Sequence, residues 1–170
     1  NPSRGMKFEL NLGGQMNTAE TSQVYGYFKP YWGFYNALTR NRKLVLKTRV
    51  QAHLNMGDDY EFYQAAQLGG NTGLRGYRLQ RFTGKSAFAT GADLRYGFDQ
   101  FTTRFLPLQI GVFTGYDLGR VWNDFEDSSK WHDSYGVGFW VNSAEAVNGT
   151  FSLFKGSEGY RFSFGFGFEF

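Results

Sequence analysis

Strict alternation of apolar and polar side chains runs through residues 44–55. One row holds Leu44, Leu46, Val50, Ala52 and Leu54, and the other holds Lys47, Arg49, Gln51, His53 and Asn55. A period of two residues is the pattern of a β-strand with two unlike faces. In a soluble protein the apolar row would face a core, whereas in a membrane barrel it faces lipid and the polar row lines the lumen. The alternation predicts a strand and leaves its surroundings open.

The end of the chain, 160–170, carries phenylalanine at every second position. Phe162, Phe164, Phe166, Phe168 and Phe170 share one face, opposite Arg161, Ser163, Gly165, Gly167 and Glu169. Such a row is hard to pack in a soluble core but suits a strand that faces lipid. A terminal phenylalanine also resembles the recognition signal of outer-membrane barrels, so we assign Phe166, Phe168 and Phe170 to a C-terminal insertion signal. An edge strand of a soluble sandwich is the alternative.

The same alternation predicts eight strands. They cover 6–13, 24–38, 44–55, 86–98, 106–118, 132–142, 147–155 and 160–170. Most approach the roughly 9 to 11 residues that a tilted strand needs to cross a bilayer. In 24–38 we expect the row of Lys29 to face inward and Pro30 to mark a bulge.

The connections alternate in length along the chain. With both termini in the periplasm, the outer loops are 14–23, 56–85, 119–131 and 156–159, and the periplasmic turns are 39–43, 99–105 and 143–146. Short periplasmic turns and longer outer loops are typical of outer-membrane barrels; only the last outer loop is short. We therefore predict an all-β fold in which residues 1–170 form one domain, an eight-stranded antiparallel up-and-down transmembrane β-barrel in the bacterial outer membrane. Its first and last strands are expected to pair.

Composition supports β structure and removes several function classes. Aromatic residues make up 20% of the chain, and mean hydropathy is −0.46, without any run near the roughly 18 apolar residues of a spanning helix. The chain has no cysteine, so neither disulfides nor thiolate metal sites are available. Its net charge of +3 is spread over alternating strands, so nucleic-acid binding is not expected. No metal or other cofactor is expected. Residues 1–14 already alternate between apolar and polar, so the chain opens with neither a charged n-region nor an apolar h-region. We therefore expect that a signal peptide was removed or that the chain is an excised domain.

The connection 56–85 is far longer than a hairpin loop, which indicates a function. It contains Leu-Gly-Gly-Asn-Thr-Gly-Leu-Arg-Gly-Tyr at 68–77 and Arg-Phe-Thr-Gly at 81–84. Ala-Asp-Leu-Arg follows at 92–95, and Phe-Thr-Gly-Tyr-Asp-Leu-Gly-Arg-Val-Trp at 113–122. In this order and spacing the motifs resemble the long loop and the following strands of the BamA superfamily. The resemblance covers 60–170 well and the first 55 residues weakly.

The resemblance implies that the Leu-Arg-Gly-Tyr loop folds back into the lumen. There Arg75 is implied to engage inward acidic residues of the next two strands, which match Asp93 and Asp117. An arginine inside a barrel needs a partner, and its fork of donors can satisfy two carboxylates. We expect Gly76 to allow the turn at the tip without a Cβ clash, and Tyr77 to pack on the inner wall.

Spacing alone places only one of the two carboxylates. Asp93 shares the inward row of Ala87, Ala89 and Gly91. A simple hairpin centred on residue 102 would pair Asp93 with a position near 111 and leave Asp117 higher on its strand. The contact between Arg75 and Asp117 is thus implied by the resemblance only, and a solvent-exposed loop is the alternative.

Superfamily members that translocate or assemble proteins are barrels of sixteen strands with periplasmic domains. Eight strands leave an interior filled by side chains, so we favour a membrane anchor or assembly-type barrel over a pore. The expected partners are outer-membrane lipid and, during insertion, the barrel assembly machinery, with a covalently linked periplasmic domain or a homodimer as further options. The first alternative is the C-terminal half of a sixteen-stranded translocation barrel, whose free edges would have to pair.

A small outer-membrane enzyme barrel is the second alternative. The chain has two histidines, His53 in the polar row of its strand and His132 in the segment Trp131-His-Asp-Ser134. A Ser134 and His132 pair would need a third group to complete a catalytic set, and none is evident. We therefore do not expect an enzyme.

Overall fold

The computed structural model describes residues 3–17, 23–57, 64–102, 107–123, 130–143 and 147–168. Its strands are β1 (Gly5–Asn17), β2 (Gln23–Ala37), β3 (Leu44–Met56), β4 (Ala66–Leu68), β5 (Phe82–Gly84), β6 (Ser86–Gly97), β7 (Phe101–Thr102), β8 (Pro107–Trp122), β9 (His132–Ser143), β10 (Val147–Gly156) and β11 (Gly159–Phe168). Within these ranges no helix is long and apolar enough to cross a membrane.

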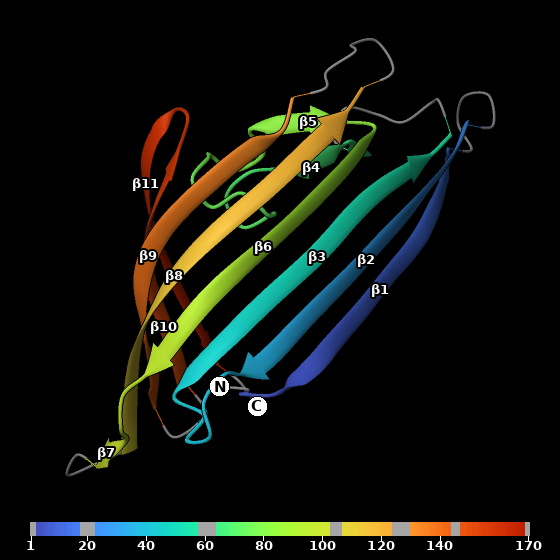
Figure 1. The fold of residues 1–170 in the computed structure, drawn as a ribbon. Helices are drawn as coiled ribbons and strands as arrows, with labels where there is room; N and C mark the ends of the chain where they lie inside the picture. Colours follow the sequence, from blue (N-terminus) through green and yellow to red (C-terminus); the bar gives the residue numbers. More distant parts are fainter. Residues whose placement is uncertain are drawn as a thin grey trace.

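One curved antiparallel sheet makes up most of the fold. Its strands lie in the order β1-β2-β3-β6-β8-β9-β10-β11, and the short β7 adds to β8. Each long strand pairs with the next long strand along the chain, and β1, β2, β3, β6 and β8 slant in the same direction (Figure 1). The all-β, antiparallel, up-and-down prediction is confirmed.

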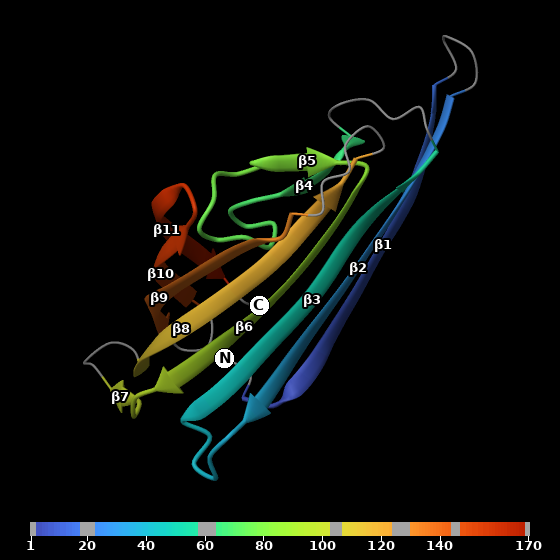
Figure 2. The same ribbon diagram turned by 45° about the horizontal axis from the view of Figure 1, so that its top comes forward.

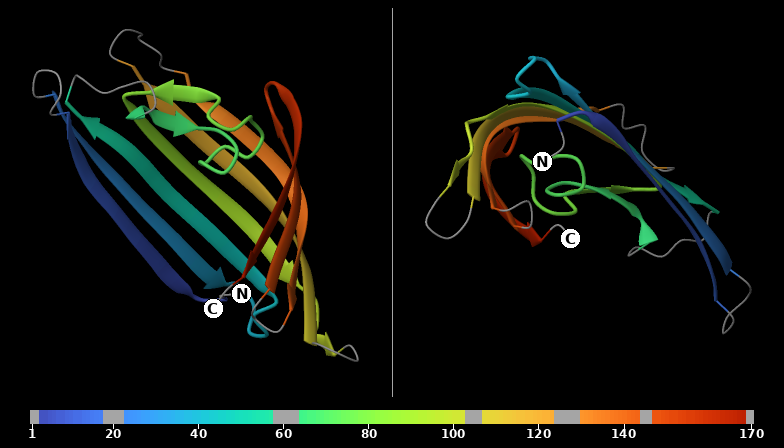
Figure 3. Two further views of the ribbon diagram at one scale, coloured as in Figure 1. Left: turned by 180° about the vertical axis from the view of Figure 1, so that it is seen from behind. Right: turned by 90° about the horizontal axis from the view of Figure 1, so that it is seen from below.

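The sheet is open. Among the described residues β1 pairs only with β2, and β11 pairs only with β10. Seen along the strands, the sheet is an arc that bends round the segment between β3 and β6 (Figure 3). The predicted closure at eight strands is therefore not present. A physical reason is that an eight-stranded barrel has an interior just wide enough for side chains, whereas this concave face holds a loop with its own backbone.

Alternation along the strands gives the sheet two unlike faces. Phe162, Phe164 and Phe166 are all exposed on the convex face, as the C-terminal pattern predicts. The side chain of Phe168 and the whole of Phe170 lie outside the described residues. In β2 the row of Lys29 lines a cavity on the concave face, which confirms its predicted direction.

The bulge predicted at Pro30 is wrong. The pairs Phe28 with Leu54 and Tyr31 with Gln51 share one register, so β2 passes through the proline without an extra residue. Some strands also run further than predicted, because the alternation extends past the length needed to cross a bilayer. The clearest case is β8, which is 16 residues long.

Small residues on the concave face make room for the loop. Ala87 and Ala89 of β6 belong to a buried cluster with Leu68, Leu74 and Tyr77 from the loop. Within the loop β4 and β5 pair with each other, a feature that the sequence did not predict. They lie over the sheet on its concave side (Figure 2).

Candidate functional site

Asp93 and Asp117 come from the adjacent strands β6 and β8. The register pairs Asp93 with Gly115 and Gly91 with Asp117, so the two carboxylates lie close together on the concave face. The expected pairing of Asp93 near position 111 is wrong. The chain forms β7, which pairs with the start of β8, before it turns. The hairpin is therefore centred later in the chain than residue 102.

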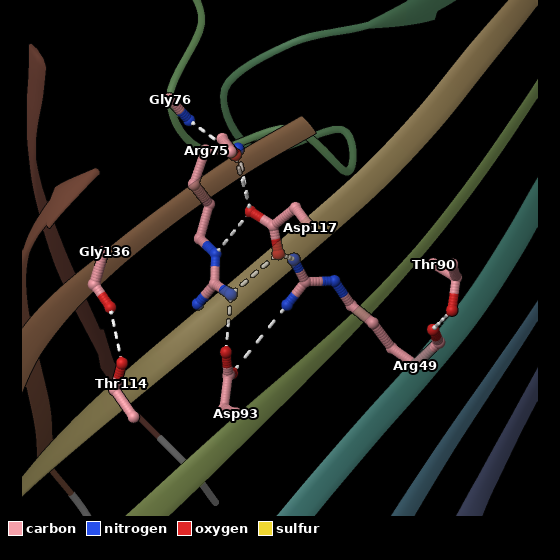
Figure 4. A network of polar contacts seen from close by, with 9 residues as sticks. Arg49, Arg75, Gly76, Thr90, Asp93, Thr114, Asp117 and Gly136 are labelled. Atoms are coloured by element: carbon pink, nitrogen blue, oxygen red, sulfur yellow. Dashed lines mark hydrogen bonds and ion pairs between the residues drawn. The ribbon is translucent and has the colours of Figure 1, made fainter. Parts of the chain in front are cut away.

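Arg75 descends from the loop between these two carboxylates (Figure 4). Its Nε donates to Oδ2 of Asp117 at 2.9 Å, and its Nη2 donates to Oδ1 of Asp117 at 2.8 Å and to Oδ1 of Asp93 at 2.5 Å. The backbone N–H of Arg75 also donates to Oδ2 of Asp117, at 3.1 Å. The structure thus brings together the three charged residues that the sequence singled out.

A second arginine, which the sequence analysis did not assign, completes the group. Arg49 of β3 donates from Nη2 to Oδ1 of Asp117, and its Nη1 lies 3.8 Å from Oδ2 of Asp93. Two guanidiniums therefore balance two carboxylates. The alternation places Arg49 in the polar row of its strand. Its position beside Asp117 depends on the register, which sets Arg49 opposite Gly91 of β6.

Burial makes these contacts strong. Asp117 is fully buried, Asp93 is 5% exposed, and the guanidinium of Arg75 lies over the ring of Phe154 at 4.0 Å. Burial by itself would lower the pKa of Arg75, but the hydrogen bonds and charges of Asp117 and Asp93 outweigh it, so this pKa is raised. Arg75 is therefore always a cation, and the group works as a fixed ion-pair network.

Gly76 fits a narrow space beside β9 and β10. A Cβ on this residue would lie 2.6 Å from Cβ of Ser134 and 2.7 Å from the backbone N of Gly156. The N–H of Gly76 donates to Oγ of Ser134 at 3.2 Å, and that hydroxyl donates to Oδ2 of Asp117 at 3.2 Å. Glycine is required here by close approach, because its φ is not in the left-handed region.

Tyr77 packs on the inner wall, as predicted. Its ring is buried and meets Phe82 edge-on, with 5.0 Å between ring centroids. Its hydroxyl donates to the carbonyl oxygen of Asp133 at 3.1 Å and accepts from the N–H of Ser157 at 3.1 Å. Tyr77 therefore links the loop to the start of β9 and to the turn that follows β10.

The side chains of Ser134 and His132, which were considered as a catalytic pair, contact other groups. The hydroxyl of Ser134 donates a hydrogen bond to Asp117, while the ring of His132 stacks on Phe82 with 3.8 Å between centroids. His53 lines the cavity between the loop and β1–β3. In the described part of the chain, no group of three histidine or acidic side chains is arranged to hold a metal ion.

Comparison with solved structures gives a likeness that bears on the fold. No protein-family model and no curated protein matches the chain. Among solved structures, BamA from Haemophilus ducreyi lacking POTRA domains 1–3 aligns over 99% of this chain with a TM-score of 0.72 and 18% sequence identity. The chain has the fold of a BamA-type barrel. It spans 39% of the length of that BamA chain. The resemblance drawn from the sequence motifs is thus confirmed for the fold.

Proposed function

We propose that this chain, as one domain, forms part of the wall of a BamA-type barrel in the bacterial outer membrane. The apolar convex face, with exposed Phe162, Phe164 and Phe166, supports contact with lipid. The polar concave face supports an interior position for the loop. Outer-membrane lipid and, during insertion, the barrel assembly machinery are the partners in this proposal.

The observation that carries the proposal is the seating of Arg75 between Asp93 and Asp117. Charged groups at membrane depth face the interior of a bundle or barrel and pair with one another. An arginine that ties a loop to two strands acts as a structural lock, and the backbone N–H, Nε and Nη2 of Arg75 all donate to carboxylates of the wall. This lock supports the proposal that the barrel is an anchor or assembly-type scaffold.

The open edges favour a wall with more than eight strands. In hydrocarbon each unpaired backbone group costs several kcal/mol, so neither β1 nor β11 can remain free. The loop on the concave face is bulkier than the side chains that fill an eight-stranded barrel. We therefore favour half of a sixteen-stranded barrel, completed by further strands or by a second copy.

Insertion and closure can be tested together. The chain should be β-rich by circular dichroism in detergent, and unboiled and boiled samples should migrate differently on a gel. A soluble monomer without detergent would contradict the membrane proposal.

Since the chain has no cysteine, Leu10→Cys with Phe164→Cys supplies the only two thiols, on the convex faces of the edge strands. Cross-links within one chain would contradict the larger barrel, whereas cross-links between chains would support assembly from two copies.

A further inference from the structure

A cavity of about 340 Å³ lies at the end of the sheet where β2 turns into β3. This end is opposite to the one that carries β4 and β5 (Figure 1). Arg4, Arg40 and Arg42 line the cavity together with Asn36 and Thr39, and no carboxylate of the described residues lines it. Three cations therefore share one space without an acidic side chain among them.

The guanidiniums of these three arginines make neither a hydrogen bond nor an ion pair with any described residue. The acidic side chains of the neighbouring segments are already paired. Glu9 of β1 pairs with Lys7, and Asp99 pairs with Lys43, each with 2.6 Å between nitrogen and oxygen. An anion from outside the chain would therefore meet three unshared cations and would relieve their mutual repulsion.

The turn that carries Arg40 and Arg42 has an ordered backbone. The N–H of Leu38 donates to the carbonyl oxygen of Leu44 at 2.8 Å, and the N–H of Arg42 donates to the carbonyl oxygen of Thr39 at 3.0 Å. Arg42 has a φ of 55°, in the left-handed region that favours glycine or asparagine. An arginine at this position costs backbone energy, which favours a role for its side chain. Because the turn is already ordered, binding an anion loses little backbone entropy.

The cavity lies where the apolar surface of the convex face ends. Met6 of β1 and Phe34 of β2 are cross-strand partners, and both are exposed on that face. Two residues closer to this end of the sheet, the same segments carry Arg4 and Asn36, which line the cavity. A change from apolar to basic side chains marks the depth at which lipid headgroups begin.

We propose that Arg4, Arg40 and Arg42 bind the phosphate of an anionic phospholipid headgroup. This site requires the membrane position proposed above for the chain. The fork of donors on a guanidinium can make two parallel hydrogen bonds to phosphate oxygens. Asn36 and Thr39 add neutral donors for the rest of the headgroup. The cavity thus ties the β2–β3 turn to the leaflet at this end of the strands.

The test uses the full chain folded in a neutral detergent, and native mass spectrometry identifies each bound molecule by its mass. Phosphatidylglycerol, phosphatidylcholine and inorganic phosphate are added separately at equal concentrations. We expect one phosphatidylglycerol to bind saturably. Phosphatidylcholine, whose own cation is repelled by the arginines, and free phosphate, which has no acyl chains, should bind at least about tenfold more weakly.

Arg40→Gln with Arg42→Gln should weaken the binding of phosphatidylglycerol by roughly tenfold or more, since each basic side chain near a membrane surface adds to the attraction. Arg40→Lys with Arg42→Lys keeps both charges and should bind more tightly than the glutamine variant. Arg4→Gln lies outside the turn and should weaken binding several-fold, so it tests the same site even where the double variants do not fold.

Arg78→Gln with Arg161→Gln is the matched control, because it removes two charges from residues outside the cavity, in the loop and in β11. It should leave binding unchanged. Equal weakening by this control and by the glutamine variant of the turn would overturn the site, as would equal binding of phosphatidylglycerol and either of the other probes. A chain that is heat-modifiable on a gel but does not select phosphatidylglycerol would overturn this site alone. A soluble monomer without detergent would overturn the membrane proposal as well.

Discussion

Arg75 and Asp117 meet through both the main chain and the side chain of the arginine. The backbone N–H and Nε of Arg75 donate to one carboxylate oxygen of Asp117, and Nη2 donates to the other. A contact made by both parts of one residue fixes the direction of the loop as well as its position.

Arg75→Ala should release the loop from the wall. Removing one partner of a buried charge pair costs about 3 to 5 kcal/mol, because the other charge is left uncompensated. The variant should unfold at lower temperature and be cleaved by added protease within 68–84, while circular dichroism reports the same strand content. Arg81→Ala is the control: its ion pair with Glu158 is half-exposed and contributes about 1 kcal/mol or less. Unchanged stability and protease resistance in Arg75→Ala would show that other loop contacts suffice.

Asp117→Asn should destabilise the protein more than Asp93→Asn. Asp117 accepts hydrogen bonds from Arg75, Arg49 and Ser134, whereas Asp93 accepts one from Arg75 and lies further from Arg49. Hydrogen bonds to charged groups contribute about 1.5 to 3 kcal/mol each, so the difference should reach about 2 kcal/mol. Denaturant unfolding of both variants measures it. Equal effects, or the reverse order, would contradict the central position of Asp117.

Gly76→Ala should displace the loop, since its new Cβ would overlap Ser134 and the backbone of β10. Overpacking of this kind costs about 1 to 3 kcal/mol. Gly165→Ala is the matched control, because a Cβ there meets nothing within 4 Å. Thermal unfolding and protease sensitivity of the loop should change for the first variant and hardly for the second. Similar behaviour of the two would mean that the wall yields to the loop.

Tyr77→Phe should weaken the loop without releasing it. The ring still packs against Phe82, but the N–H of Ser157 and the carbonyl of Asp133 lose their partner. The expected loss is about 1 kcal/mol, seen as a lower unfolding temperature with an intact protease pattern. Tyr160→Phe, at an exposed tyrosine, should have little effect. Cleavage within 68–84 in Tyr77→Phe would mean that the hydroxyl, and not Arg75, holds the loop.

The strands and their faces could be predicted from the sequence because alternation is local. Each of the eight predicted strands overlaps a long strand of the sheet, and Lys29, Asp93 and the exposed phenylalanines lie on the expected faces. The meeting of Arg75 with Asp117 followed from the resemblance of two motifs. It did not follow from spacing, since spacing gave the wrong partner for Asp93.

What could not be predicted depends on pairing between distant segments. Arg49 reaches Asp117 only through the register of β3, β6 and β8, which no single strand encodes. The sequence suggested Ser134 only as a catalytic partner of His132, whereas its hydroxyl donates a hydrogen bond to Asp117. Closure at eight strands was inferred from the strand number, whereas the space that the loop takes up was not visible in the sequence.

The side chains around Arg75 come from four neighbouring strands: Arg49 from β3, Asp93 from β6, Asp117 from β8 and Ser134 from β9. Because side chains alternate, a slip of one residue in any of these strands would turn its contribution to the opposite face. The loop can therefore seat itself only on a wall whose central strands are correctly aligned. A wall with a misaligned strand would leave the loop without some of its partners, and the loop would then be exposed to proteolysis.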